Sequence, residues 1–191
     1  MSVSVKPVLE GTVPVDLSSA FNVRGIYNDG SRFQPASSLD GGGYSLSRQA
    51  LGTEPVGDGV IFKLGQANAP DAVTSKTVKL PSGKFSSLKI LGLAVEGEQE
   101  TQTFTVNYTD GTSSSFTQSL SDWADSGNLP GESAAVEMPY RLIADGSKDE
   151  NPFNACAYSF SLDPAKTVQS VSLSTNRNVL VLAMTLVPAH K

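Results

Sequence analysis

The sequence is poor in the side chains that most enzymes use, since its 191 residues include one histidine and one cysteine. His190 is next to last, where chain ends are usually frayed, so it is a poor base for a Ser-His-Asp or Cys-His triad. Histidine-based metal sites are not expected for the same reason. Cys156 has no second thiol for a disulfide or a zinc site, and its apolar neighbours predict a buried, inert thiol.

Charged residues are also few, at 17% of the chain, and the net charge is -5. This balance opposes binding to nucleic acid, which draws most of its affinity from Lys and Arg against phosphates. The apolar runs are too short to cross a bilayer, so we expect no membrane span. The motifs GxSxG, GxGxxG and the Walker phosphate loop are missing. Composition therefore points away from several common enzyme classes.

The first eleven residues lack the apolar core of a secretory signal peptide. The chain is then either cytoplasmic or a module of a longer secreted protein, and Thr- and Ser-rich strand faces favour the second. We therefore expect an extracellular or cell-surface location. The length suits one all-β domain, which we place at 12–187, between a flexible N-terminus at 1–11 and a tail at 188–191.

Residues 102–123 carry the clearest structural signal, because two alternating apolar patterns flank an Asp-Gly pair. A two-residue loop would direct the apolar side chains of the two strands to opposite faces. A three-residue loop with Gly111 in the left-handed conformation instead pairs Phe104 with Phe116. We therefore predict a hairpin with a three-residue loop and all its large side chains on one face.

Strands are also predicted elsewhere, at 11–17, 59–64, 76–80, 86–95, 136–142, 158–162, 168–173 and 177–187. The runs 86–95 and 178–187 are apolar on both parities, which predicts strands covered on both faces. Pro14 and Pro139 restrict their strands to sheet edges or bulges, and Gly92 predicts a bulge or a close approach.

Residues 18–59 are rich in turn formers, and a loop region of this length usually has a function. Short strands are expected near 32–33 and 44–46, although 44–51 could instead form one short helix. The pattern as a whole predicts an all-β, antiparallel two-sheet sandwich, jelly-roll-like, with roughly ten strands and long loops. An up-and-down barrel is the alternative.

Sugar binding needs an aromatic ring for the apolar face of a pyranose and polar groups for its hydroxyls. The candidate ligand-binding residues are Trp123, Tyr44, Tyr27, Asp71, Asn68 and Arg141. Trp123 follows a predicted strand, where its ring either lies at a loop rim or closes the end of the sandwich. Arg141 either binds a ligand or pairs with Glu137 two positions away.

Carboxylates on predicted loops allow two further kinds of site. Calcium accepts carboxylate, amide and backbone oxygens, which are plentiful in these loops, and Asp40 and Asp71 are the favoured ligands of a structural calcium. The alternative is that these aspartates cap turns. A pair among Asp29, Asp40, Asp71 and Asp122 could instead hydrolyse a glycosidic bond, although spacing alone does not show that any two converge.

Six segments, taken together, resemble a known domain. They are VDLSSAFNVRGIYNDG (15–30), LDGGGYSLS (39–47), FKLGQANAPDAV (62–73), LPSGKFSSLKILGLAVEG (80–97), FTVNYTDGTSSSFTQSLSDW (104–123) and RNVLVLAMTL (177–186). This is a sandwich domain often attached to secreted bacterial and fungal glycoside hydrolases and related surface proteins. The resemblance runs over most of 12–187 and implies a non-catalytic, carbohydrate-binding-like jelly roll. It also implies a polysaccharide or glycan partner and a neighbouring catalytic domain.

Three functions therefore remain open on the sequence. The first is an accessory carbohydrate-binding module of a secreted or cell-surface protein. The second is a structural or assembly module that binds another protein or copies of itself through exposed sheet edges. The third is a small glycosidase or lyase that uses two loop aspartates. We expect a non-enzymatic module.

Overall fold

The computed structural model describes residues 8–125 and 129–189. His190 and most of the flexible N-terminus predicted at 1–11 lie outside these ranges. Within the predicted N-terminal segment, the backbone amide of Leu9 donates a 2.8 Å hydrogen bond to the carbonyl of Gly59. No helix in the described ranges is long and apolar enough to cross a membrane.

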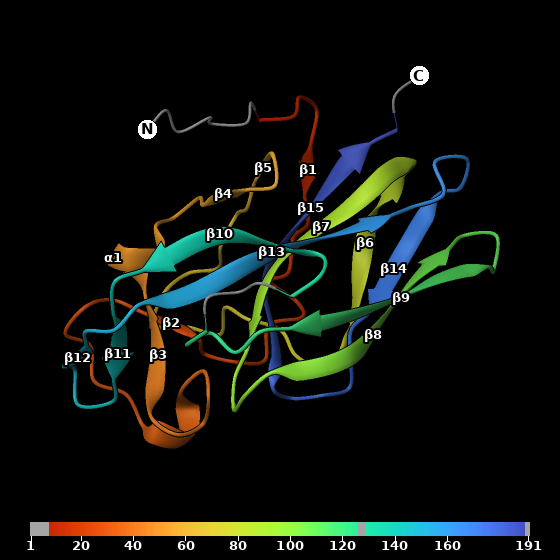
Figure 1. Ribbon diagram of the computed structural model, residues 1–191. Helices are drawn as coiled ribbons and strands as arrows, with labels where there is room; N and C mark the ends of the chain where they lie inside the picture. Colours follow the sequence, from red (N-terminus) through yellow and green to blue (C-terminus); the bar gives the residue numbers. More distant parts are fainter. Residues whose placement is uncertain (1–7, 126–128, 190–191) are drawn as a thin grey trace.

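A five-stranded sheet forms the middle layer of the molecule (Figure 1). In spatial order its strands are β1 (Val13–Pro14), β15 (Val179–Pro188), β7 (Phe85–Ala94), β13 (Phe153–Ser161) and β10 (Glu132–Met138). All of its neighbouring strands are antiparallel. Pro14 behaves as expected, because β1 is an edge of the sheet. The single strand predicted at 136–142 is wrong, because β10 ends at Met138, just before Pro139, and the chain continues as β11 (Arg141–Ile143) in another sheet.

A four-stranded antiparallel sheet covers one face of the middle layer and lies on the right in Figure 1. Its strands, in order, are β6 (Thr77–Gly83), β14 (Val168–Ser172), β8 (Gln99–Tyr108) and β9 (Ser113–Leu120). Buried side chains of both sheets form one core cluster, which includes Ile90 and Met184 from the middle sheet and Val106 and Val171 from the covering sheet.

Smaller elements cover the opposite face and lie at the left in Figure 1. A second four-stranded sheet contains β12 (Lys148–Asp149), β11 (Arg141–Ile143), β3 (Tyr44–Ser47) and β2 (Ile26–Tyr27). The remaining elements are the 3-10 turn η1 (Pro35–Ser37), the helix α1 (Arg48–Leu51) and the ribbon of β4 (Val56–Gly57) and β5 (Val60–Ile61). A second core cluster packs between this layer and the middle sheet.

The middle position of the five-stranded sheet explains why β7 and β15 lack alternation. Ile90 and Met184 face the first cluster, whereas Leu93 and Leu182 face the second. Both faces of these strands are therefore buried, as the continuous apolar runs predict. Gly92 also behaves as predicted, because an added Cβ would lie 2.7 Å from the carbonyl oxygen of Leu180 on the neighbouring strand.

The hairpin of β8 and β9 has the predicted register, with Phe104 opposite Phe116. Gly111 has a φ of 83°, and the amide of Tyr108 donates to the carbonyl of Thr112 at 2.9 Å, as a three-residue loop requires. Both Phe rings contact Phe160 of β13, at centroid distances of 5.1 and 5.0 Å. The large side chains of the hairpin therefore share the inner face.

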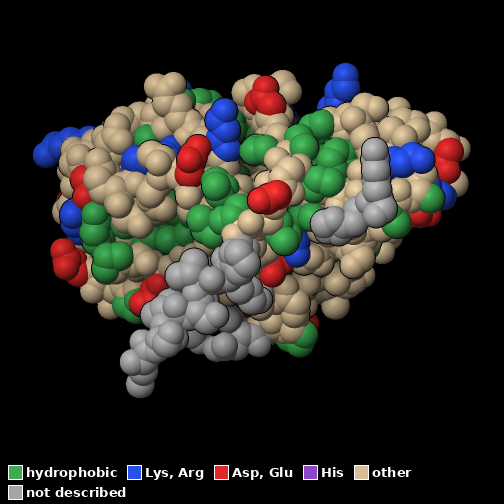
Figure 2. All heavy atoms as spheres, turned by 90° about the horizontal axis from the view of Figure 1, so that it is seen from above, with side chains coloured by type: hydrophobic (Ala, Val, Ile, Leu, Met, Phe, Trp, Pro, Cys, Tyr) green, Lys and Arg blue, Asp and Glu red, His purple; other side chains and the backbone are tan. Residues whose placement is uncertain are grey.

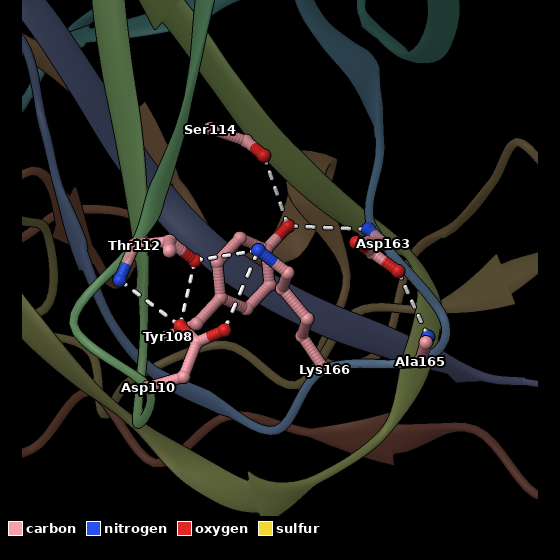
Figure 3. A network of polar contacts seen from close by, with 7 residues as sticks. All are labelled: Tyr108, Asp110, Thr112, Ser114, Asp163, Ala165 and Lys166. Atoms are coloured by element: carbon pink, nitrogen blue, oxygen red, sulfur yellow. Dashed lines mark hydrogen bonds and ion pairs between the residues drawn. The ribbon is translucent and has the colours of Figure 1, made fainter.

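Figure 3 shows how this hairpin loop is attached to the connection between β13 and β14. Lys166 from that connection pairs with Asp110 at 3.4 Å and donates to the hydroxyl of Thr112 at 2.7 Å. The hydroxyl of Tyr108 accepts a 3.1 Å hydrogen bond from the backbone amide of Asp163. The turn is thus held by a second segment as well as by its own backbone.

The antiparallel sandwich is confirmed, and ten of the fifteen strands in the described ranges have three or more residues. The short strand predicted at 32–33 is wrong, because the strand before β3 is β2, at Ile26–Tyr27. β2 pairs with β3 in parallel, which the antiparallel expectation did not include. The region 44–51 contains both predicted structures, a strand and then the single turn of α1.

Candidate functional site

The structure places five of the six predicted ligand-binding residues in two separate places and buries the sixth, Asp71. Arg141, Tyr44 and Trp123 lie together in one of them. The guanidinium of Arg141 lies 3.7 Å from the ring centroid of Tyr44, 4.5 Å from that of Phe153 and 5.0 Å from that of Trp123. Its Nε donates a 2.8 Å hydrogen bond to Asp149. This arrangement is a cation enclosed by three aromatic rings and a carboxylate of the same chain.

Two predictions for this cluster need correction. Trp123 is 3% exposed and packs on Phe153 at a centroid distance of 5.3 Å, so its ring is not at a loop rim and instead closes the end of the sandwich. Arg141 pairs with Asp149 and not with Glu137, because Arg141 begins β11, whose neighbour β12 carries Asp149 directly opposite. The cluster is therefore filled by its own cation.

Tyr27 and Asn68 lie in the second place, a surface hollow of about 530 Å³. We call it the Tyr27–Phe33 hollow. The hollow is also lined by Arg24, Arg32, Gln34 and two serines, which carry guanidinium, amide and hydroxyl groups. The ring of Phe33 stacks on that of Tyr27 with centroids 4.2 Å apart.

The ring stack is fixed by the local fold. Tyr27 is 4% exposed, and its hydroxyl donates a 2.9 Å hydrogen bond to the carbonyl of Ser37 at the end of η1. Burial raises the pKa of Tyr27, so its hydroxyl stays protonated and keeps this hydrogen bond. Phe33 is partly exposed, and its amide donates to the carbonyl of Ala144 at 3.0 Å. The hollow thus has a ring at its surface that is supported by a buried ring.

Asp71 does not line this hollow but holds the backbone beside it. Its fully buried carboxylate accepts hydrogen bonds from the amides of Gly25, at 2.7 Å, and Ile26, at 3.0 Å. Burial raises the pKa of Asp71 to about 7, against the opposing effect of these two hydrogen bonds. Because Gly25 and Ile26 stand between Arg24 and Tyr27, Asp71 acts as a positioning residue for the hollow.

Asn68 contributes to the same arrangement from the segment before Asp71. Its backbone amide donates to the carbonyl of Ile26 at 2.9 Å, and its side-chain oxygen accepts from the amide of Asn28 at 3.1 Å. Asn68 itself is exposed and has a φ of 64°, a left-handed conformation that asparagine tolerates better than most residues. Two segments far apart in sequence are thereby joined beneath the hollow.

The other favoured metal ligand, Asp40, caps a turn. One of its oxygens, Oδ1, accepts hydrogen bonds from the amides of Gly42, Gly43 and Tyr44 and from the hydroxyl of Ser38. Within the described ranges, no group of three or more His, Cys, Asp or Glu side chains is arranged to hold a metal ion. Calcium at Asp40 and Asp71 therefore stays a prediction, and both side chains show the capping role that was its alternative.

The two remaining loop aspartates also have their own partners. Asp29 accepts hydrogen bonds from Ser47 at 2.5 Å and Tyr140 at 2.7 Å and pairs with Lys148 at 2.8 Å. Burial raises the pKa of Asp29, but these hydrogen bonds outweigh burial and leave that pKa lowered. Asp122 accepts from the amides at positions 97 and 124. Each aspartate is thus held by a separate set of donors.

Cys156 is buried, as its neighbours predict. Burial raises the pKa of its thiol to about 11, and the nearby Glu132 adds to the effect. Because the thiolate is the reactive form, this environment keeps the sulfur inert.

The residues that the sequence reasoning missed are Arg24, Arg32, Phe33 and Gln34. A signal was present, since these residues lie within the long loop region that was expected to carry function. Without periodicity in that region, however, nothing in the sequence indicated which of its side chains come together.

The layers and the hollow define the class of this chain, which is a β-sandwich domain with polar and aromatic groups gathered between its loops. It belongs to the AziU2-like beta-sandwich domain family, whose model matches residues 11–190. No curated protein matches the sequence. The family match supports the sandwich; the link to glycoside hydrolases rests on the resemblance alone.

Proposed function

We propose that this chain is a non-catalytic carbohydrate-binding module and that the Tyr27–Phe33 hollow is its sugar site. The observation that carries the proposal is the partly exposed ring of Phe33 in a hollow that also presents guanidinium, amide and hydroxyl groups. An aromatic face covers the apolar face of a pyranose, and polar groups at its rim bond the hydroxyls. The volume of about 530 Å³ is within the range of small-ligand sites.

The proposal includes an accessory role outside the cell. The resemblance to domains attached to secreted glycoside hydrolases supports a neighbouring catalytic domain and an extracellular or cell-surface location. A module of this kind holds a polysaccharide near a catalytic partner and needs no reactive group of its own. Its contribution is the local concentration of substrate.

The experiment that tests the sugar site is affinity electrophoresis in gels that contain one soluble polysaccharide each. Slower migration of the wild-type chain in at least one gel, reduced in Asn68→Ala, supports the proposal. The matched control is Asn107→Ala, which removes an amide from β8, outside the hollow. Normal migration in every gel contradicts carbohydrate binding.

One observation favours the second candidate function, association with another copy of this chain. The exposed large hydrophobic side chains of the described ranges are Val8, Leu9, Val56 and Ile61. Val56 and Ile61 are opposite each other in the β4–β5 ribbon, and Leu9 is bonded to the turn of that ribbon. Figure 2 looks down on this end of the molecule and shows apolar side chains among charged ones.

Apolar side chains gathered in this way favour an interface between copies, because their contact with water is unfavourable. Light scattering over a range of concentrations tests this function. A dimer that Ile61→Lys converts to a monomer supports it, and a monomer at all concentrations contradicts it. The sugar-binding result does not depend on this outcome.

A further inference from the structure

The chain has five arginines, and three of them lie around two adjoining hollows. Arg24 and Arg32 line the Tyr27–Phe33 hollow. Arg24 also lines a hollow of about 370 Å³ together with Arg177, and the two hollows share Ser37 as well. All three arginines are exposed, whereas Arg48 and Arg141 are partly buried.

The lining of both hollows includes no Asp or Glu side chain among the described residues. In those same ranges, Arg24, Arg32 and Arg177 take part in no salt bridge, while Arg141 is paired with Asp149. This concentration of unpaired positive charge contrasts with the net charge of -5 for the whole chain. It is therefore local and cannot be a consequence of an overall basic surface.

Two carboxylates, those of Asp145 and Asp71, interact electrostatically with Arg32 and Arg24. Hydrogen bonds from Ser147 lower the pKa of Asp145, and Arg32 adds a smaller effect. Asp71 acts on Arg24 from the interior, but its pKa of about 7 means that it is partly protonated at neutral pH. Neither carboxylate forms a salt bridge with these arginines within the described ranges.

A guanidinium group is planar, always charged and able to donate two parallel hydrogen bonds to one carboxylate or sulfate. Neutral sugars need only amide and hydroxyl partners, which the hollow also has in Asn68 and Gln34. Arginines in excess of that need indicate an anionic ligand. The overall negative charge of the chain disfavours binding of an acidic polymer to the rest of its surface. An acidic ligand is therefore expected to bind where these arginines are concentrated.

We propose that the two hollows bind an acidic carbohydrate, with the arginines holding its carboxylate or sulfate groups and Phe33 covering a sugar ring. This inference rests on the proposed function and adds its ligand class. A uronic acid has a planar carboxylate and a sulfate ester has a tetrahedral sulfate group, but both offer at least two charged oxygens to a guanidinium, so the test includes both.

The test compares matched ligands that differ in charge. Isothermal titration with polygalacturonate and with its highly methyl-esterified form isolates the carboxylate, and dextran sulfate with dextran isolates the sulfate. We expect about tenfold tighter binding to the charged member of one pair. Arg24→Gln and Arg32→Gln each weaken binding to that member by about tenfold, and binding becomes weaker with added salt.

The control variant is Lys79→Gln, which removes one exposed positive charge from β6. An equal loss in Lys79→Gln, or tighter binding to single-stranded poly(U) than to any polysaccharide, overturns the inference. Equal binding to charged and neutral members overturns the inference and leaves the proposed function standing. Absence of binding to all four polysaccharides and to the wider panel of the electrophoresis experiment removes both.

Discussion

The carboxylate of Asp71 accepts a 2.7 Å hydrogen bond from the backbone amide of Gly25, which is 46 residues earlier in the sequence. The bond lies in the interior, where the side chain of Asp71 is fully buried. It joins the segment that carries Asn68 to the segment that carries Arg24 and Tyr27. The geometry of the proposed sugar site therefore depends on a group outside the hollow.

The first prediction is that Asp71 makes the stability of the chain depend on pH. The folded-state pKa of Asp71 is raised from 3.8 to about 7, so the folded protein holds a proton that the unfolded chain releases. The unfolding free energy then falls as the pH rises from about 4 to about 7, by up to about 4 kcal/mol, and is constant above that range. Denaturant melts at several pH values measure this slope.

Asp71→Asn is the matched variant, because it removes the titration and keeps one oxygen acceptor for the amide of Gly25. The NH2 group of the asparagine then faces the backbone amide of Ile26, which has lost its acceptor. This unsatisfied donor lowers the unfolding free energy by about 1–3 kcal/mol. The variant should be less stable than the wild type at pH 5 and should lose less stability between pH 5 and pH 8. Parallel pH profiles for the two proteins would show that another group is responsible.

The second prediction concerns the ring at the surface of the hollow. Phe33→Ala should weaken polysaccharide binding by about tenfold or more, because it removes roughly 1.4 kcal/mol or more of ring contact. Phe21→Ala is the control, since Phe21 is also partly buried and lines a different hollow. Titration calorimetry on both variants, with melting temperatures to verify folding, separates loss of the ring from loss of structure.

The result that counts against the site is an equal loss of affinity in Phe21→Ala and Phe33→Ala at equal melting temperatures. Such a result places the sugar elsewhere on the surface. Retained affinity in Phe33→Ala leads to the same conclusion.

The third prediction tests the loop that sets the register of the hairpin. Gly111 has a φ of 83°, and an added Cβ meets nothing within 4 Å, so a side chain there is opposed by backbone conformation alone. Gly111→Ala should lower the unfolding free energy by about 1 kcal/mol. Gly111→Asn should lower it less, because asparagine adopts this conformation more readily. Urea melts with unchanged slope measure both, and equal losses would contradict the conformational explanation.

The sequence predicts those parts of the fold in which local chemistry and burial agree. The hairpin register follows from the position of Gly111 and the parity of Phe104 and Phe116, and the doubly covered strands follow from continuous apolar runs. The parallel pairing of β2 with β3 could not be predicted, since its two residues carry no periodicity and are positioned by the remote Asp71.

The candidate site can be predicted from the sequence only in part, because contacts with distant segments decide which side chains are exposed. The sequence predicts a binding role for Tyr27 and Asn68 from their ring and amide, and the structure brings both residues into one hollow. The burial of Trp123 depends on Phe153 and Arg141, which are 30 and 18 residues later and reach it only through tertiary packing. A residue type can be chosen from a sequence, whereas its exposure is decided by distant segments.

The fourth prediction tests whether a structural calcium binds at Asp40 and Asp71, whose carboxylates otherwise act as caps for backbone amides. Melting temperature should rise on addition of the ion and fall with a chelator, with a gain of about 2.7 kcal/mol at a hundredfold excess over Kd. Asp40→Asn should abolish the response, because it removes the charge and retains an acceptor for the amides that Asp40 caps. Identical melts with ion and with chelator reject a structural site.

The fifth prediction concerns Arg141, whose guanidinium contacts the rings of Tyr44, Phe153 and Trp123 and whose Nε donates to Asp149. Arg141→Lys keeps the charge but loses the planar stack and the Nε hydrogen bond. We expect the unfolding free energy to fall by about 1–2 kcal/mol.

Trp123 is the single tryptophan of the chain, so its fluorescence reports on this cluster directly. In Arg141→Lys the smaller contact between cation and rings admits water, and the emission of Trp123 should move to longer wavelength. Arg177→Lys is the matched control, because Arg177 is exposed and does not contact these rings in the described ranges. Unchanged emission and stability in Arg141→Lys would mean that charge alone holds the cluster and that the planar stack contributes nothing measurable.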